Sequence, residues 1–157
     1  LLLTNNYTVS YNNYIELKAV LFMENISLIF KEKKLKLTPQ RLAVYQYLKS
    51  TNEHPSAETI YNALQATYPT MSLATVYKSL KTLVEVNLVQ ELNVGEGNFR
   101  YDANCFEHCH IQCVKCGKVE DLMNLPLPNL NSMVEENSDY KVNWNKLFFY
   151  GLCKECQ

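Results

Sequence analysis

The stretch that decides the fold is residues 71–103, which read MSLATVYKSLKTLVEVNLVQELNVGEGNFRYDA. Apolar residues recur through its first half at helical spacing, and at about 100° per residue they fall on one arc. They are Leu73, Val76, Leu80, Leu83 and Val84, with Tyr77 at the edge of the arc. The second half has two strand patterns on either side of NVGEGN, whose two glycines suit a flexible tip, and this predicts a two-stranded hairpin.

The opposite face of this predicted helix carries small polar residues and lysines. They are Ala74, Thr75, Lys78, Lys81 and Thr82. Hydroxyls, ammonium groups and methyls are the groups that meet phosphates and base edges in a DNA major groove. The pattern therefore favours a DNA-reading helix, with Thr75, Tyr77 and Lys78 as its predicted contacts. It also fits an ordinary amphipathic helix with a solvated face, and the segment alone does not separate the two.

Two further helices are predicted upstream of this stretch. LTPQRLAVYQYLKS begins with Thr38 as N-cap and Pro39 at the first helical position, where a missing N–H costs nothing. PSAETIYNALQATYP begins with Ser56 as N-cap and ends before Pro69. Three helices followed by a hairpin predict a winged-helix unit, which is a variant of the helix-turn-helix.

Downstream, four cysteines form two Cys-x-x-Cys pairs. They are Cys113, Cys116, Cys153 and Cys156. Four thiolates in a tetrahedron make a closed structural zinc site, and here the ion would clamp together the two ends of a small domain. Two disulfides are an alternative that a reducing compartment disfavours. A thioredoxin-like redox pair is another, but it needs a βαβ context that the sequence lacks.

A second candidate metal site lies beside the first cysteine pair, in NCFEHCHIQCVKCGKVED, residues 104–121. Along an extended strand His108 and His110 point to one face. If the following turn is centred on residues 114–115, the next strand folds back and places Asp121 opposite His108. The sequence thus predicts a cluster of two imidazoles and a carboxylate.

Two more residues could join this cluster. His54, the third histidine of the chain, lies in the loop before the second helix, and Asp102 ends the hairpin. Nitrogen and carboxylate ligands favour Fe²⁺ or Mn²⁺ over an all-sulfur zinc site. An ion that shared ligands between both halves of the chain would fix their relative orientation and could switch DNA affinity.

Charge and hydropathy say less about function. The net charge is −1, with 9 basic against 7 acidic residues in 1–92 and 6 against 9 in 93–157. This asymmetry is too weak to identify a nucleic-acid partner by charge alone. No apolar run reaches the length of a membrane span, and the first residues lack the features of a secretory signal, so we expect a cytoplasmic protein. We also expect native translation to start at Met23, with residues 1–22 as upstream sequence or a dispensable extension.

From Met23 to Gln157 the chain resembles the ferric uptake regulator family of bacterial metal-dependent repressors. The resemblance rests on LTPQR, HPSAETIY, SLATVYKSL, FRYD, HCHIQCVKCGKVEDL and YGLCKEC. It implies an α+β fold, with a winged-helix DNA-binding domain over residues 23–103 and an α/β dimerisation domain over residues 104–157. It also implies a homodimer that binds palindromic operator DNA when it holds its metal.

Within the family, the chain looks most like the peroxide-sensing repressors. That resemblance implies a regulatory Fe²⁺ or Mn²⁺ and five ligands for it, which here are His54, Asp102, His108, His110 and Asp121. It implies that Fe²⁺ reacts with hydrogen peroxide and that oxygen is added to a ligand histidine, with His54 and His108 as the candidates. It also implies that Arg41 contacts the DNA backbone.

Other functions remain open at this point. The same fold serves sensors of iron, zinc or manganese level, and residue types alone do not decide among these metals. A non-haem iron enzyme is less favoured, because five protein ligands leave little room for both substrate and oxygen, and the signature of the zinc deaminases is missing. We therefore predict a repressor rather than an enzyme. Cys105 and Cys109 depart from the family pattern, either as small apolar side chains or as thiols that are oxidised or bind metal.

Overall fold

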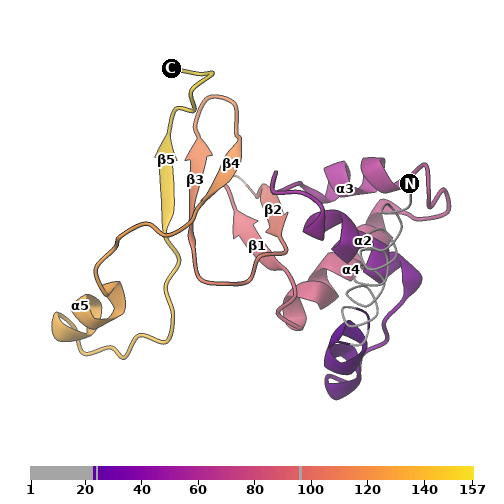
Figure 1. The fold of residues 1–157 in the computed structure, drawn as a ribbon, viewed down its shortest axis with the longest axis horizontal. Coiled ribbons are helices and arrows are strands. Elements are labelled where there is room, and N and C mark those ends of the chain that lie inside the picture. The colour runs from indigo at the N-terminus through magenta and orange to yellow at the C-terminus, as the bar shows by residue number, and fades with distance from the viewer. Residues whose placement is uncertain (1–22, 24, 96) are drawn as a thin grey trace, which may run out of the picture.

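The computed structural model describes residues 23, 25–95 and 97–157, so the expectation about residues 1–22 lies outside the described chain. Figure 1 shows a mainly helical part with a hairpin and a second part built around a small sheet. We call residues 25–103 the winged-helix part and residues 104–157 the sheet part. The hairpin of the winged-helix part lies between the helices and the sheet (Figure 1).

The winged-helix part contains the three predicted helices, after a helical stretch over residues 25–32. They are α2 (Pro39–Lys49), α3 (Ala57–Leu64) and α4 (Leu73–Glu85). Each begins after a residue whose side-chain oxygen accepts a backbone N–H three positions on, and these caps are Thr38, Ser56 and Ser72. A cap of this kind satisfies a backbone donor that the helix leaves unpaired, which typically contributes about 1 kcal/mol.

The apolar arc of α4 faces the hydrophobic core, as predicted. Val76, Leu80 and Leu83 are completely buried, while Leu73 and Val84 are partly buried against the same cluster. The other helices contribute the remaining core residues, including Phe30, Val44, Leu48 and Ile60. Because burying one such side chain stabilises a fold by about 1.5–3 kcal/mol, this packing holds α4 with its polar face outward.

The hairpin follows α4 and completes the winged-helix arrangement. Strand β1 (Gln90–Asn93) pairs antiparallel with β2 (Phe99–Asp102), and Gln90 lies directly opposite Asp102. Gly95 and Gly97 take positive φ angles of 97° and 75° at the tip, a region that residues with a Cβ adopt at a cost. The prediction of an α+β fold with a winged helix is confirmed.

The sheet part has three strands and one short helix. They are β3 (Cys109–Cys113), β4 (Val119–Leu122), α5 (Leu130–Glu136) and β5 (Phe148–Gly151). The strand order is β4-β3-β5, with β3 antiparallel to β4 and parallel to β5. Parallel neighbours end at the same edge of a sheet, and here Cys113 pairs with Gly151. This pairing brings the two Cys-x-x-Cys turns together.

The sheet part buries few of its side chains within one chain. Among its described residues, all of 104–157, only Cys109, His110, Cys113 and Val119 are buried, and α5 buries none of its residues. Tyr140 and Trp144 are 79% and 73% exposed. Hydrophobic surface therefore remains open on this part of the molecule. Within the described chain, no helix combines the length and apolar character needed to cross a bilayer.

Candidate metal centres

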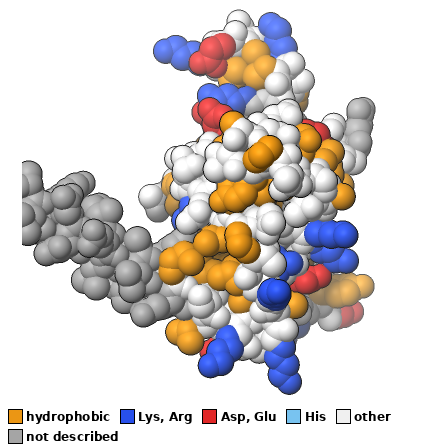
Figure 2. Space-filling view, turned by 90° about the vertical axis from the view of Figure 1, so that its right-hand side faces the viewer, with side chains coloured by type: hydrophobic (Ala, Val, Ile, Leu, Met, Phe, Trp, Pro, Cys, Tyr) orange, Lys and Arg blue, Asp and Glu red, His pale blue; other side chains and the backbone are white. Residues whose placement is uncertain are grey.

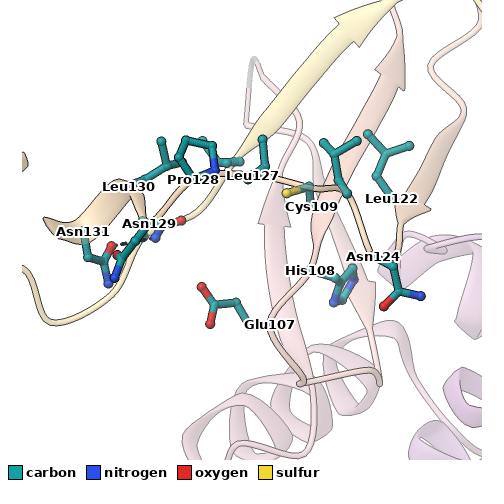
Figure 3. Close-up of a pocket in the computed structure, with 13 residues that line it drawn as sticks. Glu107, His108, Cys109, Leu122, Asn124, Leu127, Pro128, Asn129, Leu130 and Asn131 are labelled. Atoms are coloured by element: carbon teal, nitrogen blue, oxygen red, sulfur yellow. Dashed lines mark hydrogen bonds between the residues drawn. The ribbon is translucent and has the colours of Figure 1, made fainter. Parts of the chain in front are cut away.

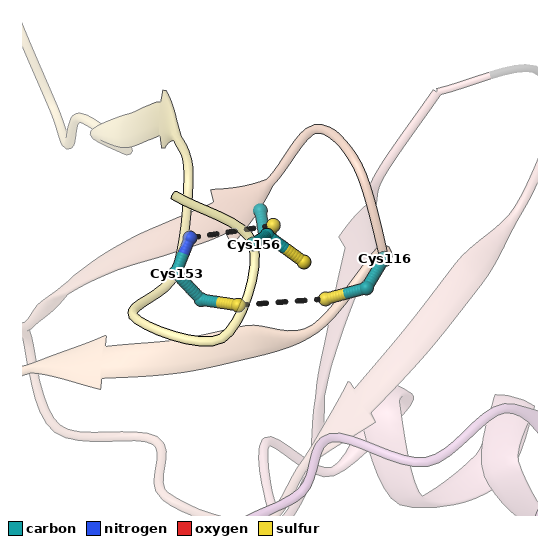
Figure 4. A group of neighbouring side chains, drawn as sticks. Cys116, Cys153 and Cys156 are labelled. Carbon is teal, nitrogen blue, oxygen red and sulfur yellow. Dashed lines mark hydrogen bonds between the residues drawn. The ribbon is translucent and has the colours of Figure 1, made fainter.

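The cysteine cluster comprises Cys113, Cys116, Cys153 and Cys156, whose four sulfur atoms all lie within 4.8 Å of one another. The first pair lies at the turn after β3, where the Gly117 N–H donates to the Cys113 carbonyl at 2.9 Å. The second pair lies in the turn after β5, where the Cys156 N–H donates to the Cys153 carbonyl at 2.9 Å. Figure 4 shows the sulfur atoms of Cys116 and Cys153 facing each other across the two turns.

The sulfur spacing fits a tetrahedral zinc ion. Zn–S bonds of about 2.3 Å place neighbouring sulfur atoms about 3.8 Å apart in a tetrahedron, and the Sγ atoms of Cys116 and Cys153 are 3.7 Å apart. A disulfide would need about 2.05 Å, and all six cysteines are free. The backbone N–H of Cys153, and then that of Cys116, lower the pKa of Cys113 to about 6. The contact with Glu155 and then burial raise the pKa of Cys153, so without an ion Cys113 is, of these two thiols, the one that loses its proton more readily.

The histidine–aspartate cluster comprises His54, Asp102, His108, His110 and Asp121, with one ligand atom from each lying within 4.8 Å of the others. Asp121 is its centre. The Oδ1 atom of Asp121 lies 2.7 Å from His54 Nε2, 3.1 Å from His108 Nε2 and 3.5 Å from His110 Nε2. The Oδ2 atom of Asp102 lies 3.3 Å from His108 Nε2 and 3.7 Å from His110 Nε2. The structure thus brings all five predicted residues together.

These contacts fit a divalent cation better than a network of hydrogen bonds. His54 is 2% exposed, and neither of its ring nitrogens makes a well-directed hydrogen bond, although Nε2 lies close to Asp121. The Nε2 atoms of His108 and His110 face each other at 3.0 Å. Neighbouring ligands of a six-coordinate ion with bonds of about 2.1 Å lie about 3.0 Å apart. Buried polar atoms rarely stay unpaired, so the cluster has the donors and the spacing of a metal site.

The register of β3 and β4 differs from the predicted one. Asp121 pairs with His110, not with His108, because the turn is centred one residue later than expected. The Cys113 N–H donates to the Lys118 carbonyl at 2.9 Å and closes this longer turn. Since side chains alternate along a strand, a shift of two residues leaves Asp121 on the same face of the sheet. Asp121 still reaches both histidines for that reason.

Sequence reasoning missed one residue of this site, Gln90. Its side-chain Nε2 donates to Asp102 Oδ2 at 2.9 Å, and the Asn104 backbone N–H donates to Asp102 Oδ1 at 2.7 Å. Burial by itself raises the pKa of Asp102, but contacts with His110, the Asn104 N–H and Gln90 outweigh it and hold that pKa below its usual value. The observed register of the hairpin pairs Asn93 with Phe99 and thereby places Gln90 opposite Asp102. Pairing symmetric about NVGEGN would instead have placed Gln90 opposite Tyr101.

The predicted DNA contacts differ in how the structure presents them. Lys78 is exposed on α4. Tyr77 is 44% exposed, and its hydroxyl donates to Glu58 Oε1 at 2.6 Å. Arg41 is engaged within the chain, since Nη1 donates to the Lys36 carbonyl and the guanidinium carbon lies 5.6 Å from the centre of the Phe30 ring. Of these three, Lys78 alone has a side chain that makes no hydrogen bond or ion pair with the described residues.

The two extra cysteines belong to neither cluster. Cys105 is exposed and Cys109 is buried. Cys109 lines a cavity of about 480 Å³ that runs from β3 and β4 to the chain segment before α5. Figure 3 shows His108 and Cys109 among its lining residues, with Leu122 beside them and Pro128 and Leu130 across the cavity.

Known proteins resemble this chain over most of its length. The sequence profile of the Ferric uptake regulator family matches residues 32–150. The transcriptional regulator PerR of Clostridium acetobutylicum is 71% identical over 135 residues, which cover 86% of this chain and 98% of that protein. The peroxide-responsive repressor PerR of Staphylococcus aureus is 36% identical over 123 residues, which cover 78% of this chain and 83% of that protein.

Solved structures agree with this similarity. The ferric uptake regulator Fur of Helicobacter pylori, described as having three functional metal binding sites, superposes with a TM-score of 0.73 at 27% identity, covering 85% of this chain and 90% of its own. The peroxide stress regulator of Campylobacter jejuni superposes with a TM-score of 0.67 at 40% identity, covering 82% of this chain and 97% of its own.

Proposed function

The chain belongs to the ferric uptake regulator family, and from that premise we propose that it is a metal-dependent transcriptional repressor that responds to peroxide. The observation that carries the proposal is the origin of the five ligands. His54 and Asp102 come from the winged-helix part, whereas His108, His110 and Asp121 come from the sheet part. One ion held by all five would fix the orientation of the DNA-binding helices relative to the sheet. Two relatives that bear the name PerR support the peroxide response.

The two clusters have different roles in this proposal. The cysteine cluster would hold a structural zinc, because four thiolates close its coordination. The histidine–aspartate cluster would hold Fe²⁺ or Mn²⁺, which prefer nitrogen and oxygen ligands. Fe²⁺ held by these residues would supply a redox-active centre for hydrogen peroxide. In the net reaction, one peroxide oxygen would insert into a carbon–hydrogen bond of a ligand imidazole, which gives up two electrons, and the other oxygen would leave as water. An oxidised His54 or His108 would no longer donate its lone pair, and the link between the two parts would loosen. With Mn²⁺, the same residues would keep the repressing arrangement without this oxidation.

The sheet part would serve as the dimerisation domain, over residues 104–157, and residues 23–103 would form the DNA-binding domain. Large apolar side chains lie exposed on and around α5, among them Met133, Val134, Tyr140 and Trp144. An exposed apolar surface of this kind marks an interaction site. A homodimer with twofold symmetry would present two copies of α4 to the two halves of a palindromic operator. Because DNA is the proposed partner, we place the protein in the cytoplasm.

The DNA-facing surface would be formed by α4 and its neighbours. Figure 2 views the molecule from the side of the winged-helix part and shows basic side chains projecting around patches of apolar surface. The hydroxyl of Thr75, the ring of Tyr77 and the ammonium of Lys78 would meet the major groove, with Arg41 as a contact to the DNA backbone.

We expect Lys78→Ala to weaken DNA binding about equally for all sequences, because a lysine–phosphate contact carries no sequence information. The slope of log K against log salt should fall by about one unit, as one condensed counterion fewer is released. The measurement is fluorescence anisotropy over a salt series, with duplexes that the Mn²⁺-loaded wild type has selected from a random library. Lys141→Ala, an exposed lysine of the sheet part, is the control and should keep the wild-type slope. An unchanged slope for Lys78→Ala removes this residue from the interface.

The proposed function is tested by peptide mass spectrometry after brief exposure to dilute hydrogen peroxide, comparing Fe²⁺-loaded and Mn²⁺-loaded protein. We expect one added oxygen on the peptide of His54 or His108, in the iron form only, together with loss of DNA binding. An iron form that keeps unmodified histidines and stays on DNA would instead identify a sensor of metal level. Oxidation confined to Cys105 or Cys109 would identify a thiol switch.

A further inference from the structure

Gln90 makes two hydrogen bonds through a single amide nitrogen. It is the first residue of β1, and its Nε2 donates to Asp102 Oδ2 at 2.9 Å and to the Asn104 carbonyl oxygen at 2.6 Å. The nitrogen of a primary amide has two hydrogens, so both are used. One bond reaches a ligand of the histidine–aspartate cluster, and the other reaches the first residue of the sheet part.

These bonds make the two oxygens of Asp102 unequal. Oδ1 accepts the backbone N–H of Asn104 at 2.7 Å. Oδ2 accepts from Gln90 and also faces His108 Nε2 at 3.3 Å and His110 Nε2 at 3.7 Å. A carboxylate oxygen has two lone pairs, so Oδ2 can accept from Gln90 and still bind an ion. The carboxylate is thus held with one oxygen toward the histidines and the other occupied by the backbone.

We propose that Gln90 is a positioning residue for the regulatory metal: it fixes Asp102 as a single-oxygen ligand and ties that ligand to the junction between the two parts. The inference rests on the regulatory site of the proposed function. Hydrogen-bond partners of metal ligands orient those ligands, and their loss typically costs about 10–100-fold in metal affinity. Gln90 acts through Asp102 and does not itself reach the ion.

The residue type at this position follows from the same geometry. A glutamate would place a second carboxylate against Asp102, and like charges at that distance repel. A lysine would donate hydrogen bonds but would add a positive charge beside the site of a cation. The position therefore needs two hydrogen-bond donors, one for Asp102 and one for the Asn104 carbonyl, on a side chain without charge. The amide nitrogen of glutamine has two hydrogens and no charge, and it reaches both partners.

The test compares Gln90→Met with Gln65→Met, both in the zinc-loaded full chain. Methionine keeps the length of the side chain and removes both donors. Gln65 is a matched control, because it is half-buried and its Nε2 donates to the Met71 carbonyl at 3.0 Å, away from both clusters. We expect Gln90→Met to weaken Mn²⁺ binding by about 10–100-fold and Gln65→Met to leave it unchanged. The absorption spectrum of Co²⁺ in the regulatory site should change for Gln90→Met alone, since the ligand arrangement changes.

Two results would overturn the inference. One is Mn²⁺ affinity of Gln90→Met within about twofold of wild type, far from the loss expected for a partner of a ligand. The other is a Gln90→Met protein that binds Mn²⁺ more weakly, keeps the wild-type Co²⁺ spectrum and melts at a lower temperature in the absence of Mn²⁺. Gln90 would then stabilise the fold without positioning the ligand. The variant Asp102→Ala distinguishes a failure of the role proposed for Gln90 from a failure of the regulatory site in the proposed function. If that variant binds Mn²⁺ like wild type, both fail; if it binds weakly while Gln90→Met binds normally, the positioning role alone fails.

Discussion

In the proposed zinc-bound homodimer, Cys113→Ser is expected to release the ion, unfold the sheet part and separate the two copies. The sheet part buries only four of its side chains within one chain, so its stability depends strongly on the ion. Structural zinc in small domains is bound with an apparent free energy of about 10–16 kcal/mol at pH 7, and this binding energy is folding energy. Replacing the thiolate that ends β3 opens the closed site and removes the clamp between the turns after β3 and β5. Zinc content, the circular dichroism spectrum and the molar mass from light scattering measure these three losses.

Cys105→Ser is the matched control, because Cys105 is a free exposed thiol outside the cysteine cluster. It should keep its zinc, its fold and its mass. A Cys113→Ser protein that remains a stable dimer would refute the clamp, and one that keeps its zinc would show that three thiolates are sufficient.

Asp121→Ala is expected to abolish metal-activated DNA binding while leaving the zinc in place. A single oxygen of this residue contacts the Nε2 atoms of all three histidines, at 2.7 to 3.5 Å. Its loss removes the one carboxylate oxygen of the cluster that contacts all three imidazoles, and leaves Asp102 facing only His108 and His110. Loss of a residue that only hydrogen-bonds to a metal ligand typically lowers metal affinity by about 10–100-fold. Loss of the ligand itself should therefore lower the Mn²⁺ affinity by more than about 100-fold. Calorimetric titration with Mn²⁺ measures this affinity, and anisotropy with selected duplexes measures the response of DNA binding to the metal.

Glu120→Ala provides the comparison on the same strand. Glu120 points to the other face of β4 and forms an exposed ion pair with Lys118 at 2.8 Å, a type of contact that contributes little to stability. This variant should bind Mn²⁺ and DNA like wild type. Equal losses in both variants would mean that β4 tolerates no change, and wild-type Mn²⁺ affinity in Asp121→Ala would place the regulatory metal elsewhere.

The helices and their first residues were predictable because they depend on neighbouring residues. Thr38, Ser56 and Ser72 cap the helices that they precede in sequence, and the apolar arc of α4 is the face that the core buries. The end of α3 was wrong, since the helix ends at Leu64 and residues 65–67 form a turn, whereas the sequence predicted a helix up to Pro69.

The predicted register of β3 and β4 was wrong by two residues. The length of the turn between these strands depends on the backbone geometry around Cys116 and Gly117. The face of Asp121 was nevertheless right, since that error preserves the alternation of side chains.

The sequence by itself determined the types of ligand and the two metal chemistries. Four cysteines in two tight pairs favour zinc, and imidazoles with carboxylates favour a harder ion. Spacing along the chain is local information. It was sufficient to predict that His108 and His110 share a face and that each Cys-x-x-Cys pair forms a tight turn.

Only the tertiary structure decided which distant residues meet. The parallel pairing of β3 with β5 brings Cys153 and Cys156 to Cys113, and the packing of the winged-helix part against the sheet brings His54 and Asp102 to Asp121. The hydrogen bonds of Gln90 depend on the same packing. Such contacts join residues tens of positions apart, and their free energy comes from the whole core and sheet rather than from any one segment.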